Sequence, residues 1–385
     1  MEPTKTLADA ASHPEHCFML AESVRYLNCA GQAPRLRSVH AAGEAALLRS
    51  ARPWQVSMQD WLAQPERVRA SAAGLLGVSA DCLALQTTVA YGMRLATAIL
   101  PLSRAQTALV LADEHPSGTA PWLAACQRRD AQLVPVRRGP GQDWSGAVLA
   151  AIDSRCAVLV LPICHWHDGS QLDLVRIAAR ARQVGAALVI DATQAWGVLP
   201  INVAALDPDL LIAAGHKWLL GAPGLAFTYV APRHHAAEPL EQYAFARESG
   251  ESLPAVDAQP LRYRGGARRF DSAGIYNSLC LAMAEPALHQ LAQWDAEALR
   301  IQLAGWQSAL RSALHAKGLG HCWRRADSPH ISALDVQGSA AQMAARLRAE
   351  GFVVAARGTV LRVSPHVHSS PEEAEALAAA LSRLI

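Results

Sequence analysis

Two short stretches decide how this chain folds, AALVID at residues 186–191 and LLIAAGHK at residues 210–217. Each opens with an aliphatic run and closes on a side chain that can carry chemistry, Asp191 in the first and Lys217 in the second. Runs of the same kind surround them: TALVLA at 107–112, AQLVPV at 131–136, AVLVLP at 157–162 and LAFTYV at 225–230. Apolar runs separated by longer amphipathic segments are typical of a mostly parallel sheet with helices on both faces. We therefore expect an α/β fold.

Beyond this sheet the sequence predicts a second, smaller unit. Residues 275–317 have the pattern of one long helical stretch, broken near Pro286. Further on, strand patterns alternate with helix patterns, which indicates a C-terminal α+β domain; the strands are expected at 330–336, 351–356 and 360–364, and the helices at 340–350 and 371–384. The expected organisation is an N-terminal arm over 1–25, a large α/β domain over 26–255 and a small domain over 256–385.

Composition narrows the class of protein. Lys and Arg number 35 against 33 Asp and Glu, and a net charge of +2 gives no electrostatic argument for a nucleic-acid or acidic-membrane partner. The longest apolar stretch, at 156–164, contains Pro162 and is far too short to span a bilayer. The N-terminus lacks the apolar segment of a secretory signal, and the eight cysteines form no C-x-x-C pair. We expect a cytoplasmic protein with neither a nucleic-acid nor a membrane partner.

The two strand ends carry the chemical signal. In a parallel sheet, ligands bind outside the carboxyl ends of the strands, where Asp191 and Lys217 are expected. A pyridoxal-phosphate site needs a lysine to hold the cofactor as a Schiff base and a carboxylate to keep the pyridine nitrogen protonated. On residue types alone, a solvated Lys217 and a helix-capping Asp191 explain the spacing equally well.

The motifs around these residues, DATQAWG at 191–197 and AAGHKWLLGAPG at 213–224, resemble the aminotransferase class V family of fold-type I pyridoxal-phosphate enzymes. That family includes cysteine desulfurases, selenocysteine lyases, kynureninases and isopenicillin N epimerase-like proteins. Further motifs resemble the family in order: YLNCAGQAP at 26–34, QTTVAYGMRLA at 86–96, DEHPSGTAPW at 113–122, RRFDSAGIYN at 268–277 and LRVSPHVHSS at 361–370. The resemblance implies pyridoxal 5'-phosphate as cofactor, a large domain with a mainly parallel sheet, a small C-terminal α+β domain and a homodimer.

The resemblance also implies roles for individual residues. Lys217 matches the Schiff-base lysine that acts as the base at Cα, Asp191 the partner of the pyridine nitrogen, and His115 the ring stacked on the cofactor. The other cofactor contacts that it implies are Thr87, Thr88 and His216 at the phosphate and Gln194 at the phenolic oxygen. Substrate contacts are expected from Arg362, whose planar guanidinium suits an α-carboxylate, and from Asn28 and His167.

Simpler explanations remain open for several of these residues. Thr87 and Thr88 suit a helix cap, His115 suits a loop, and Arg362 suits a surface ion pair. Arg269 and Asn277 are expected to reach the neighbouring subunit's cofactor. Small residues stand at 273–274, where the family has a polar phosphate contact, and this departure leaves the contact across the dimer open.

The reaction is less well defined than the cofactor. Transamination, racemisation, elimination and hydrolytic C–C cleavage all fit a lysine-bound cofactor. No cysteine occurs between residues 351 and 370, where desulfurases need a nucleophile, and His216 stands where kynureninases usually carry tyrosine. We expect an aminotransferase acting on an amino acid, with a lyase, an epimerase or a kynureninase-like hydrolase as alternatives.

Two alternatives belong to other classes of protein. The run CHWHD at 164–168 suggests a metal-dependent hydrolase using His165 and His167, but known metal-motif spacings are not reproduced and no third histidine follows. We therefore predict no metal site. A non-catalytic pyridoxal-phosphate-binding regulator would need an N-terminal helix-turn-helix, for which the expected arm leaves no room.

Overall fold

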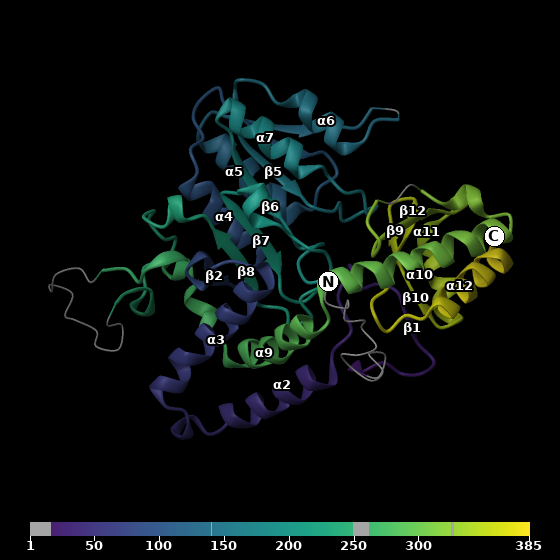
Figure 1. Ribbon diagram of the computed structural model, residues 1–385, viewed down its shortest axis with the longest axis horizontal. Helices are drawn as coiled ribbons and strands as arrows, with labels where there is room; N and C mark the ends of the chain where they lie inside the picture. Colours follow the sequence, from purple (N-terminus) through teal and green to yellow (C-terminus); the bar gives the residue numbers. More distant parts are fainter. Residues whose placement is uncertain (1–16, 140, 249–261, 325–326) are drawn as a thin grey trace, which may run out of the picture.

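The computed structural model describes residues 17–139, 141–248, 262–324 and 327–385. A seven-stranded sheet runs through its larger lobe in the order β2-β8-β7-β6-β5-β3-β4 (Figure 1). β8 pairs antiparallel with β2 and β7, and the other neighbouring pairs of this sheet are parallel. This confirms the predicted α/β fold. The strands are β2 (Leu83–Gln86), β3 (Thr107–Leu111), β4 (Gln132–Val136), β5 (Cys156–Pro162), β6 (Ala187–Asp191), β7 (Leu210–Ala214) and β8 (Ala226–Val230).

The strands β3, β5, β7 and β8 are buried on both faces, which explains why they are mostly apolar, whereas the edge strand β4 is partly exposed. Along β5, Leu159 and Leu161 belong to one hydrophobic core while Val158 and Val160 belong to the other, as the alternation of a strand requires. Helices α3, α6, α7 and α9 pack on the first face, and α4 and α5 on the second. These helices are α3 (Met58–Leu76), α4 (Val89–Ile99), α5 (Pro116–Arg128), α6 (Trp144–Ala151), α7 (Leu174–Val184) and α9 (Ser278–Gln293); the short α8 (Val203–Leu206) precedes β7.

The stretch expected to form one long helix contains two, α9 and α10 (Ala296–Ala316). The expected break at Pro286 is wrong, because this proline lies inside α9, which continues to Gln293. The chain breaks at Asp295, whose φ of 29° is incompatible with helical backbone. The Asp295 carboxylate accepts hydrogen bonds from the amides of Glu297 and Ala298 and so caps the start of α10.

The C-terminal lobe is built on a three-stranded antiparallel sheet in the order β11-β12-β9. Leu299 of α10 lies in the core of the large lobe, whereas Trp306 and Leu310 lie in the core of the C-terminal lobe, so α10 connects the two (Figure 1). None of the helices in the described ranges is long and apolar enough to cross a membrane. The other elements of this lobe are β9 (Ser332–Asp335), α11 (Ala340–Ala349), β10 (Phe352–Val353), β11 (Ala355–Arg357), β12 (Val360–Val363) and α12 (Pro371–Leu384).

The N-terminal part of the described chain belongs to both lobes. β1 (Arg25–Tyr26) pairs in parallel with β10 of the C-terminal lobe, and Asn28 forms a bridge with Ser364. α2 (Arg37–Ser50) then packs against α9 on the large lobe. The domain boundary expected between residues 255 and 256 lies outside the described residues.

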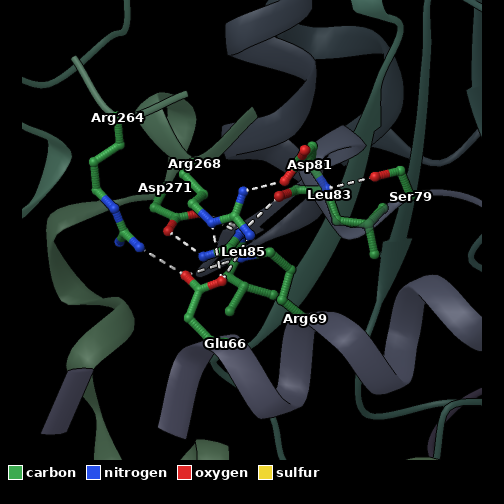
Figure 2. A network of polar contacts seen from close by, with 9 residues as sticks. All are labelled: Glu66, Arg69, Ser79, Asp81, Leu83, Leu85, Arg264, Arg268 and Asp271. Carbon is green, nitrogen blue, oxygen red and sulfur yellow. Dashed lines mark hydrogen bonds and ion pairs between the residues drawn. The ribbon is translucent and has the colours of Figure 1, made fainter. Parts of the chain in front are cut away.

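A buried ion pair fixes β2, the strand at one edge of the large sheet. Arg69 of α3 is 0% exposed and contacts Asp271, itself 2% exposed, through Nη1 at 3.0 Å and Nη2 at 2.6 Å. Arg69 also donates to the Leu83 carbonyl at 2.6 Å, and Asp271 accepts from the Leu85 amide at 2.7 Å. Figure 2 shows these groups meeting between α3 and β2, surrounded by further charged side chains. The pair therefore holds β2 in place against α3.

Candidate active site

A cavity of about 490 Å³ lies at the carboxyl ends of the parallel strands, the place where open α/β sheets bind ligands. Loops that follow β2, β3, β5, β6 and β7 supply much of its wall, and Arg357 and Arg362 reach it from the C-terminal lobe. Asn28 and His167 do not line the cavity, but each contacts an arginine that does. The predicted residues that line it are Thr87, Thr88, His115, Asp191, Gln194, His216, Lys217 and Arg362.

Asp191 and Lys217 stand at the ends of neighbouring strands, β6 and β7. Asp191 Oδ1 accepts a hydrogen bond from the Thr193 amide at 2.9 Å, and the Thr193 hydroxyl accepts one from the Ala214 amide at 3.3 Å, which ties the two strand ends together. Burial lowers the pKa of Lys217 to about 8; Asp191 opposes this shift, and Arg362 adds to it. Lys217 therefore releases its proton more readily than an exposed lysine does.

The first turn of α4 lies in the same wall. Thr88 caps this helix, with its hydroxyl accepting a hydrogen bond from the Tyr91 amide at 3.1 Å. Thr87, Val89 and Ala90 line the cavity beside it. Amides of a helix N-terminus and the positive end of its dipole favour a phosphate. Thr88 is thus both a helix cap and a wall residue, and its expected contact with a phosphate stays a prediction.

His216 and Gln194 both line the cavity. Burial and the charge of Lys217 lower the pKa of His216, so its ring is neutral near pH 7. Gln194 Nε2 donates to the Ala30 carbonyl at 2.9 Å, and Gln194 Oε1 accepts from the Trp218 indole at 2.7 Å. These two bonds orient the amide and leave one N–H of Gln194 for a ligand.

His115 is the cap of α5, where its Nδ1 accepts a hydrogen bond from the Ser117 amide at 3.2 Å. Its ring stands edge-on to Trp166, with centroids 5.6 Å apart. Burial, with Lys217 nearby, lowers the pKa of His115 and favours a neutral ring. Trp166 also lines the cavity, so the rings of His115 and Trp166 are neighbours in its wall.

Glu114 lines the cavity and was missed by sequence reasoning. Its Oε1 accepts a hydrogen bond from the His115 amide at 2.7 Å, while Oε2 is buried without a hydrogen-bond partner. Burial and the charge of Asp191 raise the pKa of Glu114 to about 7. A signal was present, since Glu114 comes just after an apolar run, much as Asp191 closes one.

Arg362 is a buried cation at the cavity, only 1% exposed. Its neighbours Leu361 and Val363 pack in the core of the C-terminal lobe, as alternation along the strand predicts. Arg362 Nη1 donates to the Trp166 carbonyl at 2.8 Å, and Nη2 donates to Asn28 Oδ1 at 3.2 Å. Both acceptors are neutral, and among the described residues no carboxylate pairs with Arg362. Burial and Arg357 lower the pKa of Arg362 to about 9.

The side chains of the run CHWHD at 164–168 form hydrogen bonds that hold the cavity wall in place. His165 Nδ1 lies 2.9 Å from Asp168 Oδ1, and Asp168 Oδ2 accepts a hydrogen bond from Arg138 at 2.7 Å. His167 Nε2 lies 3.0 Å from the Arg357 carbonyl oxygen. Over the described ranges, no group of three His, Cys, Asp or Glu side chains could hold a metal ion. A metal-dependent hydrolase built on His165 and His167 gains no support from this arrangement.

The cavity provides the groups that pyridoxal phosphate requires. Lys217 is an amine of lowered pKa, Asp191 is a carboxylate on the adjacent strand, and the start of α4 is a helix N-terminus of the kind that favours a phosphate. Arg362 adds a cation without a counter-ion in the described chain. The residues present therefore fit the cofactor and an anionic substrate.

Comparisons with known proteins agree with this fit. The model of the aminotransferase class-V family matches residues 26–359. The chain is 30% identical to a kynureninase of Deinococcus radiodurans over 76% of this chain and 71% of that protein. It is 26% identical to an isopenicillin N epimerase of Streptomyces clavuligerus over 87% of this chain and 88% of that protein.

The fold is shared with solved structures. C-DES, in a structure with glycine covalently linked to its pyridoxal-phosphate cofactor, matches with a TM-score of 0.85 at 18% identity, over 96% of this chain and 98% of that one. The match over nearly the whole of both chains identifies the fold-type I architecture. The chain therefore belongs to the aminotransferase class-V family, and it is a pyridoxal-phosphate-dependent enzyme.

Proposed function

We propose that this enzyme is an aminotransferase that acts on an amino-acid substrate. Arg362 carries the proposal, because a buried guanidinium without a carboxylate partner in the described chain faces the same cavity as Lys217. An α-carboxylate would supply the missing negative charge, and its two oxygens suit the fork of a guanidinium. The α-amino group of the same molecule would then lie toward Lys217.

The other wall residues receive roles from their positions. When bound, pyridoxal phosphate supplies an electron-accepting ring that stabilises negative charge at the substrate Cα. Lys217 would hold the cofactor until the substrate's amino group displaces it, and its freed amine would then accept the Cα proton, which its pKa of about 8 favours. Asp191 would keep the pyridine nitrogen protonated. His115 would stack on the ring, and Gln194 would donate to the phenolic oxygen.

At the other end of the cofactor, Thr87, Thr88 and His216 would hold the phosphate. The cavity residues that would meet substrate are Arg362 and Trp166, while Asn28 and His167 would act as positioning residues through the arginines. These assignments share one support, namely that each residue lines the cavity or contacts a residue that does.

A desulfurase reaction receives little support at this site. β11 and β12 are joined by the two-residue turn Gly358–Thr359, which offers no loop for a nucleophilic cysteine. Cys164 lines the cavity, but burial raises the pKa of its thiol to about 12. A thiol that keeps its proton is a poor nucleophile.

An epimerase is the second candidate. Glu114, with an unpartnered Oε2 and a pKa of about 7, would be a second group able to take or give a proton beside Lys217. The similarity to isopenicillin N epimerase over most of both chains agrees with this reading.

Product analysis separates the candidates. Purified holoenzyme is incubated with each L-amino acid and a 2-oxo acid acceptor, and the products are resolved by chiral chromatography. We expect a new 2-oxo acid and a new amino acid in equal amounts. A D-amino acid formed without a new 2-oxo acid would identify an epimerase. Release of ammonia or of a cleaved side chain would identify a lyase or a hydrolase.

Arg362→Ala should leave the cofactor absorption unchanged but raise the amino-acid concentration needed to shift it by at least about tenfold, or roughly 1.4 kcal/mol. Arg362→Lys should also weaken binding, because the charge is kept but the fork is lost. A spectral titration with the best substrate measures both variants. A wild-type midpoint in Arg362→Ala would show that another group holds the α-carboxylate.

We also propose a homodimer. Large apolar side chains are exposed at the end of α2 and in the turn that leads to α3, among them Leu48 at 73% and Trp54 at 78%. A second copy of the chain would remove such surface from water. Asn277 caps α9 and Arg269 lies over the Tyr263 ring, so both expected cross-subunit residues have partners within their own chain. Light scattering should give twice the 41.1 kDa mass of one chain.

A further inference from the structure

Two arginines, not one, face the cavity from the C-terminal lobe. In the antiparallel pair of β11 and β12, Ala355 lies opposite Arg362 and Arg357 lies two residues further along. Alternate residues of a strand share a face, so Arg357 and Arg362 project to the same side as diagonal neighbours, about 7–8 Å apart. Both line the cavity that contains Lys217.

Neither arginine has an acidic partner in the described part of the chain. Arg357 Nη1 donates to the Ala356 carbonyl at 2.9 Å, and its Nε is buried without a hydrogen-bond partner. Its guanidinium carbon lies 5.8 Å from the centre of the ring of Trp166, the residue whose main-chain oxygen Arg362 contacts. Where this protein uses a buried arginine for structure, it pairs the charge, as Arg69 with Asp271 shows.

The acids of the cavity wall do not pair with the two arginines. Asp191 and Glu114 come from the ends of β6 and β3 and act on Lys217, and in the described ranges neither forms an ion pair with Arg357 or Arg362. One α-carboxylate neutralises one guanidinium, and a cofactor phosphate has its own site at the start of α4. Resting on the function proposed above, we propose that Arg357 binds a second acidic group, so that the substrate is an amino acid with an acidic side chain.

The test uses amino acids that differ in charge and hardly in shape. Holoenzyme is titrated with L-aspartate, L-asparagine, L-glutamate and L-glutamine while the cofactor absorption is followed. For at least one acid, the concentration that gives half of the spectral change (the midpoint) should be about tenfold or more below that of its amide. Arg357→Met should raise the midpoint of that acid to that of its amide, and Arg357→Lys should keep part of the preference because it keeps the charge. Arg311→Met removes an exposed charge from α10 of the same lobe and should keep the full preference.

The other outcomes separate this inference from the proposed function. Equal midpoints for acids and amides in the wild-type protein would overturn the acidic substrate, although any spectral response would still support an amino-acid enzyme. An equal loss for all four amino acids in Arg357→Met would place Arg357 at the α-carboxylate instead, and weaker binding of pyridoxal phosphate would place it at the cofactor. No response to any amino acid, together with no product in the assay above, would reject the proposed function itself.

Discussion

Lys217→Ala should bind pyridoxal phosphate without a covalent bond and lose turnover by at least about a thousandfold, a loss typical of removing the group that carries a covalent step. The chain contains three lysines, Lys5, Lys217 and Lys317, so covalent attachment has few possible positions. Of the lysines in the described ranges, Lys217 alone lines the cavity, beside Asp191. Borohydride reduction of the wild-type holoenzyme, followed by peptide mass mapping, should place the cofactor on Lys217.

Lys317→Ala is the matched control, because Lys317 is exposed just after α10. This variant should keep the label, the absorption and the turnover. A label on Lys5 or Lys317, or full turnover in Lys217→Ala, would contradict the role given to Lys217.

Arg69→Met should lower the free energy of unfolding by about 3–5 kcal/mol, because it leaves the buried Asp271 carboxylate without its cation. Asp271 would keep the Leu85 amide as a hydrogen-bond donor, which is too little to replace two contacts with Arg69. Urea unfolding followed by circular dichroism measures the loss. Arg69→Met combined with Asp271→Leu should recover part of it, since no unpaired charge then stays buried.

The control for this prediction lies on the same helix. Arg67 forms an ion pair with Glu285 at 2.9 Å, and its side chain is 57% exposed. Because solvent screens such a pair, Arg67→Met should change the unfolding midpoint only slightly. If the two variants lose equal stability, the Arg69–Asp271 pair does not hold β2 in the way described.

Local patterns are enough to predict much of the fold from the sequence. The buried strands of a parallel sheet are continuous apolar runs, and such runs place Asp191 at the end of β6 and Lys217 just after β7, on the same edge of the sheet. β2 has no such signal, because four residues give too short a pattern. The break between α9 and α10 is misplaced by sequence reasoning, since it depends on a positive φ at Asp295 and not on Pro286.

What the sequence could not predict involves residues distant along the chain. Arg69 and Asp271 are 202 positions apart, and neither has a neighbouring motif that announces a partner. The position of Arg357 on the same face as Arg362 depends on the register of β11 and β12. The burial that raises the pKa of Glu114 likewise depends on packing between separate loops.

Because β1 pairs with β10, one wall of the active site can form only after β10 has been synthesised. Arg25 and Phe352 are partners 327 positions apart, so the strand β1 has no partner until residue 352 has left the ribosome. All seven strands of the large sheet lie at or before Val230, so they can pair with one another earlier. Ala30 and Gly31, which follow β1 and line the cavity, are fixed together with Arg357 and Arg362. The wall assigned to the substrate is therefore the last part of the site to form, after the strands that carry Asp191 and Lys217.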